Sequence, residues 1–365
     1  MMTEKVQAAT LVEPMRFEVR EYDLPELSTD DGLLKIERCG VCGSDVHAWQ
    51  STRRGVRIMG HENLGYIAKL GREAEARWGV KEGDRVALEE YIPCGVCDIC
   101  RSGEYRFCPQ TDIGLGGDRL WYGSVPAARE PALWGGYSQY MYLHRGSVLH
   151  RVPEHVPPAE AAFFLPLSNG FEWVCGYGQV KTGDVVVVQG PGQQGLACVL
   201  AAKEAGASMI IVSGLGRDEA RLAVASKLGA DATVDVENES LVDRVLDMTG
   251  GHGADVTVNV SGADGTVAES IAFAARDGVI VLGGPGEQQV STVGTGRKNL
   301  TLKWAHGHSY RSVELAIWSI ASGRYPIGLV TTHHFPLGEA ALAIRSVAGE
   351  GLPGAIHVSI DPWAA

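Results

Sequence analysis

The chain lacks any long apolar run and carries fewer basic than acidic side chains. None of its runs approaches the ~18 apolar residues that a membrane-spanning helix needs. Its 32 Lys and Arg face 44 Asp and Glu, and the resulting net charge of −12 disfavours a nucleic-acid partner, which clustered basic residues would bind. Repeats and low-complexity segments are also missing. These absences leave an acidic globular protein as the expectation.

A secretory signal is missing as well, because Met1–Lys5 lead directly into mixed polar sequence. We therefore expect a cytoplasmic protein whose cysteines stay reduced. Four of the eight cysteines are clustered at Cys94, Cys97, Cys100 and Cys108. This spacing lets four thiols meet around one Zn²⁺, and in a reducing compartment it indicates a metal site rather than a disulfide cluster. Four thiolates leave no open position for a substrate, so the predicted zinc is structural.

The pattern of apolar and turn-forming residues changes after Pro157-Pro158. Before it, short β-branched runs such as Leu33–Glu37 alternate with Gly and Pro, a pattern typical of short strands joined by turns. After it, apolar strands such as Val185–Val188 alternate with helices, which indicates a parallel, doubly wound sheet. Beyond about Trp304 the pattern becomes irregular again. The prediction is an α/β fold in which a doubly wound sheet is inserted into a mostly β domain.

The predicted domains follow these changes. Residues 1–160 are predicted to form a mostly β domain, with the four cysteines in a lobe at about 93–110, and residues 305–365 to return to it; the motifs described below make this the expected catalytic domain. Residues 161–304 are predicted to form the doubly wound domain, for which the glycine-rich turn described next indicates dinucleotide binding of the Rossmann type.

A glycine-rich turn follows the strand Val185–Val188. It reads Gly190-Pro191-Gly192-Gln193-Gln194-Gly195 and leads into a helical stretch. A G-x-G-x-x-G run between a strand and a helix predicts dinucleotide binding. Gly190 permits the tight turn, Gly192 lets the backbone approach a pyrophosphate, and Gly195 lets the helix approach the strand. The segment including Gln193 and Gln194 is therefore expected to hold the cofactor.

The end of the next strand is expected to distinguish NAD from NADP. An NAD site carries Asp or Glu about twenty residues after the turn, on the ribose 2′-hydroxyl. Here the segment Val212–Arg217 contains Ser213, Gly214 and Arg217 but no carboxylate. Ser213 and Arg217 can bind a 2′-phosphate, which favours NADP(H) over NAD(H). The alternative is that Arg217 is a solvated residue in the first turn of the next helix.

A second candidate metal site comes from Cys42, His61 and Glu62. One thiolate, one imidazole and one carboxylate suit a catalytic zinc with an open position. A lone histidine is more often structural, but the spacing to Cys42 and the position before the four-cysteine lobe favour a metal site.

Together these motifs resemble the zinc-dependent medium-chain dehydrogenase/reductase family of alcohol and polyol dehydrogenases, over essentially the whole chain. The resemblance is carried by Cys42–His47, Gly60–Glu62, the four-cysteine lobe, Gly190–Gly195 and Trp134–Tyr140. It implies a GroES-like catalytic domain and hydride transfer between a nicotinamide cofactor and an alcohol, a polyol or its carbonyl counterpart. It also implies a catalytic and a structural zinc, and a homodimer or homotetramer.

The resemblance further assigns roles within the segment Cys42–His47. Cys42 and His61 become zinc ligands, and Asp45 orients His61 as a supporting carboxylate. Ser44 hydrogen-bonds the substrate hydroxyl, and His47 passes its proton towards solvent. The alternative for His47 is a surface residue without a relay role.

One position departs from the family pattern. Many members carry Cys, Asp or Glu where this chain has Leu165, which cannot bind metal. Cys175 lies too far along the chain to replace it, so Glu62 is expected to be a direct ligand, as in the polyol dehydrogenase branch. Leu165 also motivates an alternative, a reductase of the same fold without catalytic zinc. A remote alternative is a zinc-ribbon module for nucleic acid, which the acidic charge and the glycine turn disfavour.

The sequence says little about the substrate. Trp49, Trp121 and Tyr122 either line an amphipathic pocket or cover the core. A further set of histidines shows no metal-ligand pattern and is expected to have packing or surface roles: His306, His308, His333 and His334.

Overall fold

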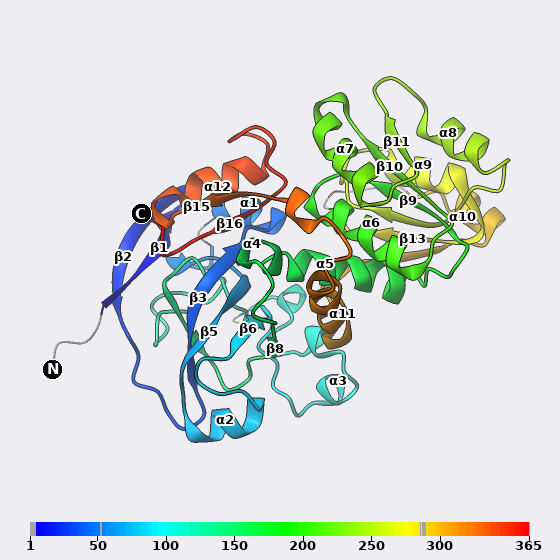
Figure 1. The fold of residues 1–365 in the computed structure, drawn as a ribbon. Coiled ribbons are helices and arrows are strands. Elements are labelled where there is room, and N and C mark those ends of the chain that lie inside the picture. Colours follow the sequence, from blue (N-terminus) through cyan, green and yellow to red (C-terminus); the bar gives the residue numbers. More distant parts are fainter. Residues whose placement is uncertain (1–4, 52, 118, 285, 287–289, 365) are drawn as a thin grey trace. The chain divides into compact units, whose positions relative to one another are not determined.

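The computed structural model describes residues 5–51, 53–117, 119–284, 286 and 290–364, and it divides the chain into two compact units (Figure 1). The first unit comprises residues 1–165 and 331–365, and the second comprises residues 166–330. The N-terminal segment used for the signal-peptide prediction lies mostly outside the described residues. None of the helices in these ranges has the length and apolarity needed to cross a membrane.

The first unit is built on a seven-stranded sheet and a smaller three-stranded one. In the larger sheet the order is β15-β16-β3-β5-β6-β8, with β7 also paired to β3. The smaller sheet has the order β2-β1-β4. The strands are β1 (Lys5–Glu13), β2 (Arg16–Asp23), β3 (Gly32–Gly40), β4 (Arg57–Ile58), β5 (Glu62–Leu70), β6 (Arg85–Leu88), β7 (Tyr140–Leu143), β8 (Leu149–Arg151), β15 (Thr331–Phe335) and β16 (His357–Ile360).

Short helices connect these strands. They are α1 (Gly43–Trp49), α2 (Arg72–Trp78), α3 (Asp98–Arg101), η1 (Tyr105–Phe107), η2 (Ile113–Leu115), α4 (Pro158–Ala161), η6 (Leu337–Glu339) and α12 (Ala340–Val347). Apolar side chains of the sheets and of α12 form one core, to which Leu34, Ile36 and Ile344 belong. β3 and β5 both contribute to this core, and their ends carry the candidate site of Cys42, His61 and Glu62.

The two C-terminal strands complete the larger sheet. β16 runs antiparallel to β3, and Ser359 pairs with Gly40. On the other side of β3, Gly40 pairs with Glu62 at the start of β5. Residues from the beginning and the end of the chain are thereby placed on three adjacent strands.

The second unit holds a six-stranded parallel sheet with the order β11-β10-β9-β12-β13-β14, as expected for a doubly wound fold. The strands are β9 (Val185–Gln189), β10 (Met209–Gly214), β11 (Ala232–Asp235), β12 (Ala254–Asn259), β13 (Ala274–Leu282) and β14 (Thr301–Trp304). The strand order reverses between β9 and β12. In open α/β sheets this is the place where ligands bind, outside the carboxyl ends of the strands.

The helices of this unit are η3 (Glu172–Tyr177), α6 (Gln193–Ala205), η4 (Gly216–Asp218), α7 (Glu219–Leu228), α8 (Leu241–Met248), α9 (Thr266–Phe273), α10 (Thr292–Lys298), α11 (Tyr310–Ala321) and η5 (Ile327–Leu329), while α5 (Phe164–Phe171) begins at the boundary with the first unit. Of these helices, α6, α7, α9, α10 and η3 pack against the parallel sheet. Val187 belongs to a cluster with Leu241 and Phe273, whereas Val188 faces Gly195 in α6. The strand is therefore buried on both faces, which explains its unbroken run of valines.

The chain leaves the second unit later than the predicted boundary at residue 305. Residues up to 330 belong to this unit. The reason is a set of hydrogen bonds to η3: Trp173 Nε1 donates to Gly307 O (3.0 Å), Tyr177 OH donates to His306 O (3.2 Å), and Ser309 Oγ donates to Glu172 Oε2 (2.6 Å). The irregular sequence after Trp304 thus packs against a helix of the inserted unit.

Candidate metal centres and cofactor site

The four predicted lobe cysteines lie together. The Sγ atoms of Cys94, Cys97, Cys100 and Cys108 are all within 4.8 Å of one another, and none of the four is in a disulfide. The Sγ atoms of Cys97 and Cys100 are 3.5 Å apart. The backbone N–H groups of Val96 and Cys97 lower the pKa of the Cys94 thiol to about 6, whereas burial raises the pKa of the Cys100 and Cys108 thiols. The convergence of four sulfur atoms fits a closed tetrahedral zinc site, in which the metal itself would favour the thiolate form.

A buried polar contact ties this lobe to the large sheet. Tyr105, between the third and fourth cysteines, donates its hydroxyl to Glu89 Oε1 at 2.6 Å. His150 on β8 contacts the same oxygen through Nε2, also at 2.6 Å. Because all three side chains are buried, the contact fixes the lobe against β6 and β8. Sequence reasoning missed it, since the partners are far apart in the chain.

The second predicted group also comes together. One ligand atom from each of Cys42, His61 and Glu62 lies within 4.8 Å of the other two. Cys42 follows β3 and precedes α1, while His61 and Glu62 stand at the start of the neighbouring strand β5. Gly60 has φ +94°, and a Cβ there would lie 2.5 Å from Tyr137 Cδ1. Glycine before the histidine is thus required both by backbone conformation and by space.

Asp45 connects Cys42 and His61. Its Oδ2 accepts hydrogen bonds from the Cys42 backbone N–H and from the Tyr137 hydroxyl, each at 3.0 Å, and its Oδ1 lies 3.4 Å from His61 Nδ1. Burial disfavours the charged imidazole, but the charge and hydrogen bonding of Asp45 raise the pKa of His61 well above its usual value. With Nδ1 engaged, Nε2 is the ring nitrogen left for a metal. Tyr137 was not predicted as a site residue, although it lies within the Trp134–Tyr140 motif.

Glu62 is fully buried, and only one of its two carboxylate oxygens has a hydrogen-bond partner among the described residues. Its Oε2 lies 3.3 Å from Nε2 of the buried His357, whereas Oε1 has no hydrogen-bond partner among the described residues. An isolated buried carboxylate oxygen is costly unless a hydrogen bond or a cation compensates it. The thiolate, imidazole and carboxylate of this group therefore fit a zinc ion. Leu165 is buried and offers no donor atom.

The remaining predicted residues of the first unit differ in their surroundings. Ser44 and His47 are exposed, and they lie about one turn apart on α1. Trp49 and Tyr122 belong to the hydrophobic core. Trp121 is only partly buried, and its ring meets the His61 ring edge-on with centroids 6.3 Å apart. Of the three aromatic residues considered for a pocket, Trp121 is thus placed beside the candidate metal ligands.

The glycine turn in the second unit has the geometry that a dinucleotide requires. Gly190 has φ +104°, and a Cβ at Gly195 would lie 1.9 Å from Gly190 O. Gly192 precedes α6, and a Cβ there would meet no described atom within 4 Å. The turn thus leaves the N-terminus of α6 open to an anion. The side-chain amide of Gln194 is engaged within the protein, because its Nε2 donates a hydrogen bond to Pro166 O at 3.2 Å. Gln193 is the first residue of α6.

The end of β10 carries Ser213 and Gly214, and Arg217 follows in η4. Ser213 is buried and its carbonyl accepts from the Gly190 N–H at 2.9 Å. Arg217 is exposed, and within the described ranges it makes no hydrogen bond or ion pair. A carboxylate does reach this segment, because Glu237 Oε2 accepts from the Gly216 N–H at 2.8 Å. Sequence reasoning missed Glu237 since it follows the adjacent strand β11 rather than β10.

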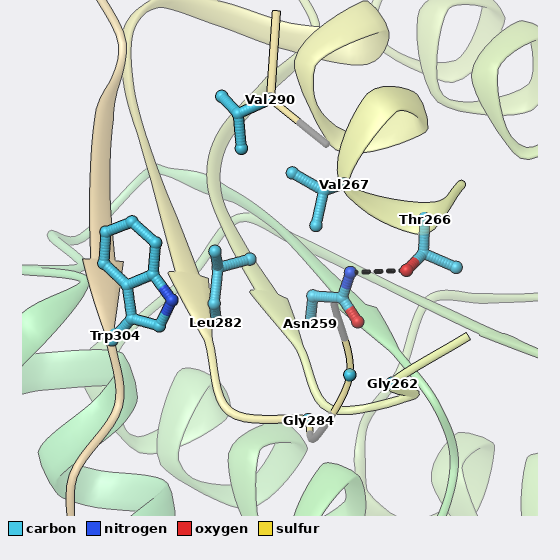
Figure 2. Close-up of a pocket in the computed structure, with 9 residues that line it drawn as sticks. Asn259, Gly262, Thr266, Val267, Leu282, Gly284, Val290 and Trp304 are labelled. Atoms are coloured by element: carbon cyan, nitrogen blue, oxygen red, sulfur yellow. Dashed lines mark hydrogen bonds between the residues drawn. The ribbon is translucent and has the colours of Figure 1, made fainter. Parts of the chain in front are cut away.

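A pocket opens at the carboxyl ends of β12, β13 and β14 (Figure 2). Asn259, Leu282 and Trp304 stand in register on these strands, and Asn259 Nδ2 donates to Thr266 Oγ1 at 2.8 Å. The pocket lies beside the point where the strand order reverses, so it is a candidate for the cofactor. Its lining residues are Asn259, Gly262, Thr266, Val267, Leu282, Gly284, Gly286, Val290 and Trp304.

Two family models match the chain. Residues 28–154 match the alcohol dehydrogenase GroES-like domain, and residues 195–318 match the zinc-binding dehydrogenase domain. The "Probable alcohol dehydrogenase adh" of Mycobacterium tuberculosis is 39% identical, with 98% of each chain covered. The "Erythritol/L-threitol dehydrogenase" of Mycolicibacterium smegmatis is 30% identical, with 94% of this chain and 95% of the relative covered. A Sinorhizobium meliloti protein solved bound to NADP is 25% identical, with a TM-score of 0.84, 98% of this chain and 100% of that chain covered.

The four-cysteine lobe yields a test of metal content. We expect the purified chain to hold about two zinc ions and the Cys94→Ser variant about one, because three thiolates no longer close the structural site. Inductively coupled plasma mass spectrometry measures this directly. Cys175→Ser removes a cysteine outside both groups and is expected to keep both ions. An unchanged content in Cys94→Ser would contradict the assignment.

Asp45 yields a second test. Asp45→Asn keeps the shape of the side chain but removes the charge beside His61. We expect zinc affinity at the Cys42 group to fall about 10–100-fold, as for other supporting carboxylates of ligating histidines. Competition with a chromophoric chelator measures the affinity, and Glu75→Gln on α2 serves as an exposed control. Equal affinities in Asp45→Asn and wild type would show that Asp45 does not orient the ligand.

Proposed function

This chain belongs to the zinc-dependent medium-chain dehydrogenase/reductase family, and from that premise we propose how its residues carry out the reaction. It is an oxidoreductase that transfers hydride between a nicotinamide cofactor and an alcohol or polyol, or the corresponding carbonyl compound. The observation that carries the proposed mechanism is the convergence of Cys42, His61 and Glu62, with one buried Glu62 oxygen left without a hydrogen bond.

We assign the catalytic zinc to these three side chains and a structural zinc to the four-cysteine lobe. A zinc ion at the first site would polarise the substrate oxygen and lower the pKa of a bound alcohol. Asp45 keeps the His61 ring in the orientation that leaves Nε2 for the metal. Three protein ligands leave a position for the substrate oxygen, whereas the lobe has none.

Ser44 and His47 move the proton in this proposal. As Ser44 Oγ takes the hydroxyl proton of the alcohol, its own hydroxyl proton would pass on towards His47, about one turn further along α1, and His47 would release a proton to solvent. In the carbonyl-reducing direction the same groups return a proton to the substrate oxygen. The exposure of both side chains supports exchange with water. A bound nicotinamide cofactor would supply the hydride chemistry, as the acceptor in alcohol oxidation and the donor in carbonyl reduction.

Gly190–Gly195 and the N-terminus of α6 would hold the pyrophosphate of the cofactor, and the pocket of Figure 2 would take a further part of the same molecule. We propose NADP(H) rather than NAD(H), because the exposed Arg217 is available for a 2′-phosphate. Glu237 is the group that opposes this preference, since its carboxylate lies at the neighbouring Gly216.

The alternative is a reductase of the same fold that works without catalytic zinc, and the loss of a ligand at Leu165 is the observation that favours it. Activity of His61→Ala separates the two. The zinc mechanism requires near-complete loss of turnover in this variant, whereas the metal-free mechanism leaves turnover intact.

The substrate can be identified by screening alcohols, polyols and their carbonyl counterparts with both NAD(H) and NADP(H). We also propose a homodimer or homotetramer, which light scattering of the purified chain tests.

The proton relay is tested by His47→Gln. We expect kcat for alcohol oxidation to fall by about 10²-fold at neutral pH, because a positioned proton carrier is lost. The deficit should shrink as pH rises, since hydroxide then takes the proton directly. Profiles of kcat against pH measure this, with the exposed His252→Gln as control. A uniform loss at every pH would argue against the relay.

Cofactor choice is tested by Arg217→Ala. The dissociation constant for NADPH should rise about tenfold or more, while that for NADH stays nearly unchanged, because only NADPH carries the 2′-phosphate. Nucleotide fluorescence measures both. Arg221→Ala is the matched control, since Arg221 pairs with Asp218 at 3.3 Å. Equal weakening of NADH and NADPH in Arg217→Ala would overturn the preference for NADP.

A further inference from the structure

The side chains of His357 and Glu62 meet across strand β3, which lies between their own strands. Gly40 is the residue of β3 at this point, and it pairs with both Ser359 of β16 and Glu62 of β5. A Cβ at Gly40 would lie 2.1 Å from Glu62 Oε2 and 2.9 Å from His357 Nε2. The missing side chain is therefore what allows the imidazole and the carboxylate to touch.

The contact gives the two oxygens of Glu62 different surroundings. An ionised carboxylate only accepts hydrogen bonds, so the His357 Nε2–H donates to Oε2, at 3.3 Å. Oε1 keeps no hydrogen bond among the described residues. The imidazole is itself held in place, because its ring packs edge-on against Phe163 with centroids 5.3 Å apart. One oxygen is thus anchored and the other remains available.

We propose that His357 is a positioning residue for the catalytic metal, which anchors one oxygen of Glu62 so that the carboxylate can bind zinc beside Cys42 and His61. This rests on the proposed function, which places zinc at these ligands. The anchor matters more in this chain because Leu165 provides no ligand, leaving Glu62 as the sole carboxylate of the group. Without the donor, nothing in the described contacts holds the buried carboxylate in that orientation.

The test compares zinc affinity in His357→Leu and His357→Gln. Leucine fills a similar space without a donor, whereas the glutamine amide can donate from about the position of Nε2. Competition with a chromophoric chelator should show about 10–100-fold weaker zinc binding at the Cys42 site in His357→Leu. His357→Gln should remain close to wild type. If the His357–Glu62 contact served only the stability of the fold, zinc affinity would not depend on whether residue 357 carries a hydrogen-bond donor.

Controls separate this effect from damage to the fold. The zinc of the four-cysteine lobe should remain bound in both variants, and thermal unfolding should show folded protein. His334 on β15 contacts Ser359 Oγ, and Ser359 lies on β16 like His357. His334→Leu removes this hydrogen bond and should leave zinc affinity unchanged. Gly40→Ala is an independent variant, because its methyl group would displace Glu62 Oε2, and it should weaken the same site while keeping the lobe zinc.

The outcomes distinguish this inference from the proposed function. If His61→Ala abolishes zinc binding at the site but His357→Leu binds as tightly as wild type, the positioning role is overturned and the metal centre stands. If His61→Ala also binds like wild type, the metal centre itself is wrong. Weakening in both leucine and glutamine variants would show that the imidazole acts through packing and would also overturn the proposal.

Discussion

The burial of two carboxylates, those of Asp45 and Glu62, is the constraint around which the first unit is arranged. A buried charge is tolerated only where hydrogen bonds or a cation compensate it. Asp45 gains a backbone N–H, a tyrosine hydroxyl and an imidazole. Glu62 has His357 on one oxygen and, in the proposed mechanism, zinc on the other. Gly40 and Gly60 clear the space in which these partners meet.

The features that sequence predicted well depend on local spacing. The four cysteines lie close along the chain, and backbone turns suffice to bring them together. The glycine turn likewise joins adjacent elements, with Gly190 in the left-handed region and Gly195 against Gly190 O. Cys42, His61 and Glu62 are farther apart along the chain, and their grouping is predicted from the combination of ligand types and their position before the four-cysteine lobe, which the resemblance to known dehydrogenases then supports.

What sequence did not predict depends on tertiary pairing. His357 reaches Glu62 because β16 pairs with β3, and Glu237 reaches Gly216 because β11 lies beside β10. Neither contact leaves a periodic signal, since each partner is determined by strand order. Composition also cannot distinguish an aromatic residue in a pocket from one in the core, and Trp49 and Tyr122 proved to be core residues while Trp121 lies at His61. The predicted domain boundary at residue 305 differs from the observed one because of tertiary contacts as well. Hydrogen bonds from Trp173 and Tyr177 hold residues 306 and 307 in the second unit.

The strand that carries His357 has a consequence for the order in which the molecule is assembled. Glu62 and His357 are 295 residues apart, with the whole second unit made between them. Joining ends so distant is slow and costs chain entropy, so contacts of this kind form late in folding. During synthesis the inserted unit can fold while the sheet around Glu62 still lacks β15 and β16. The contact between Glu62 and His357 therefore cannot form before β16 has been made, so the carboxylate of Glu62 gains this hydrogen-bond partner late in the synthesis of the chain.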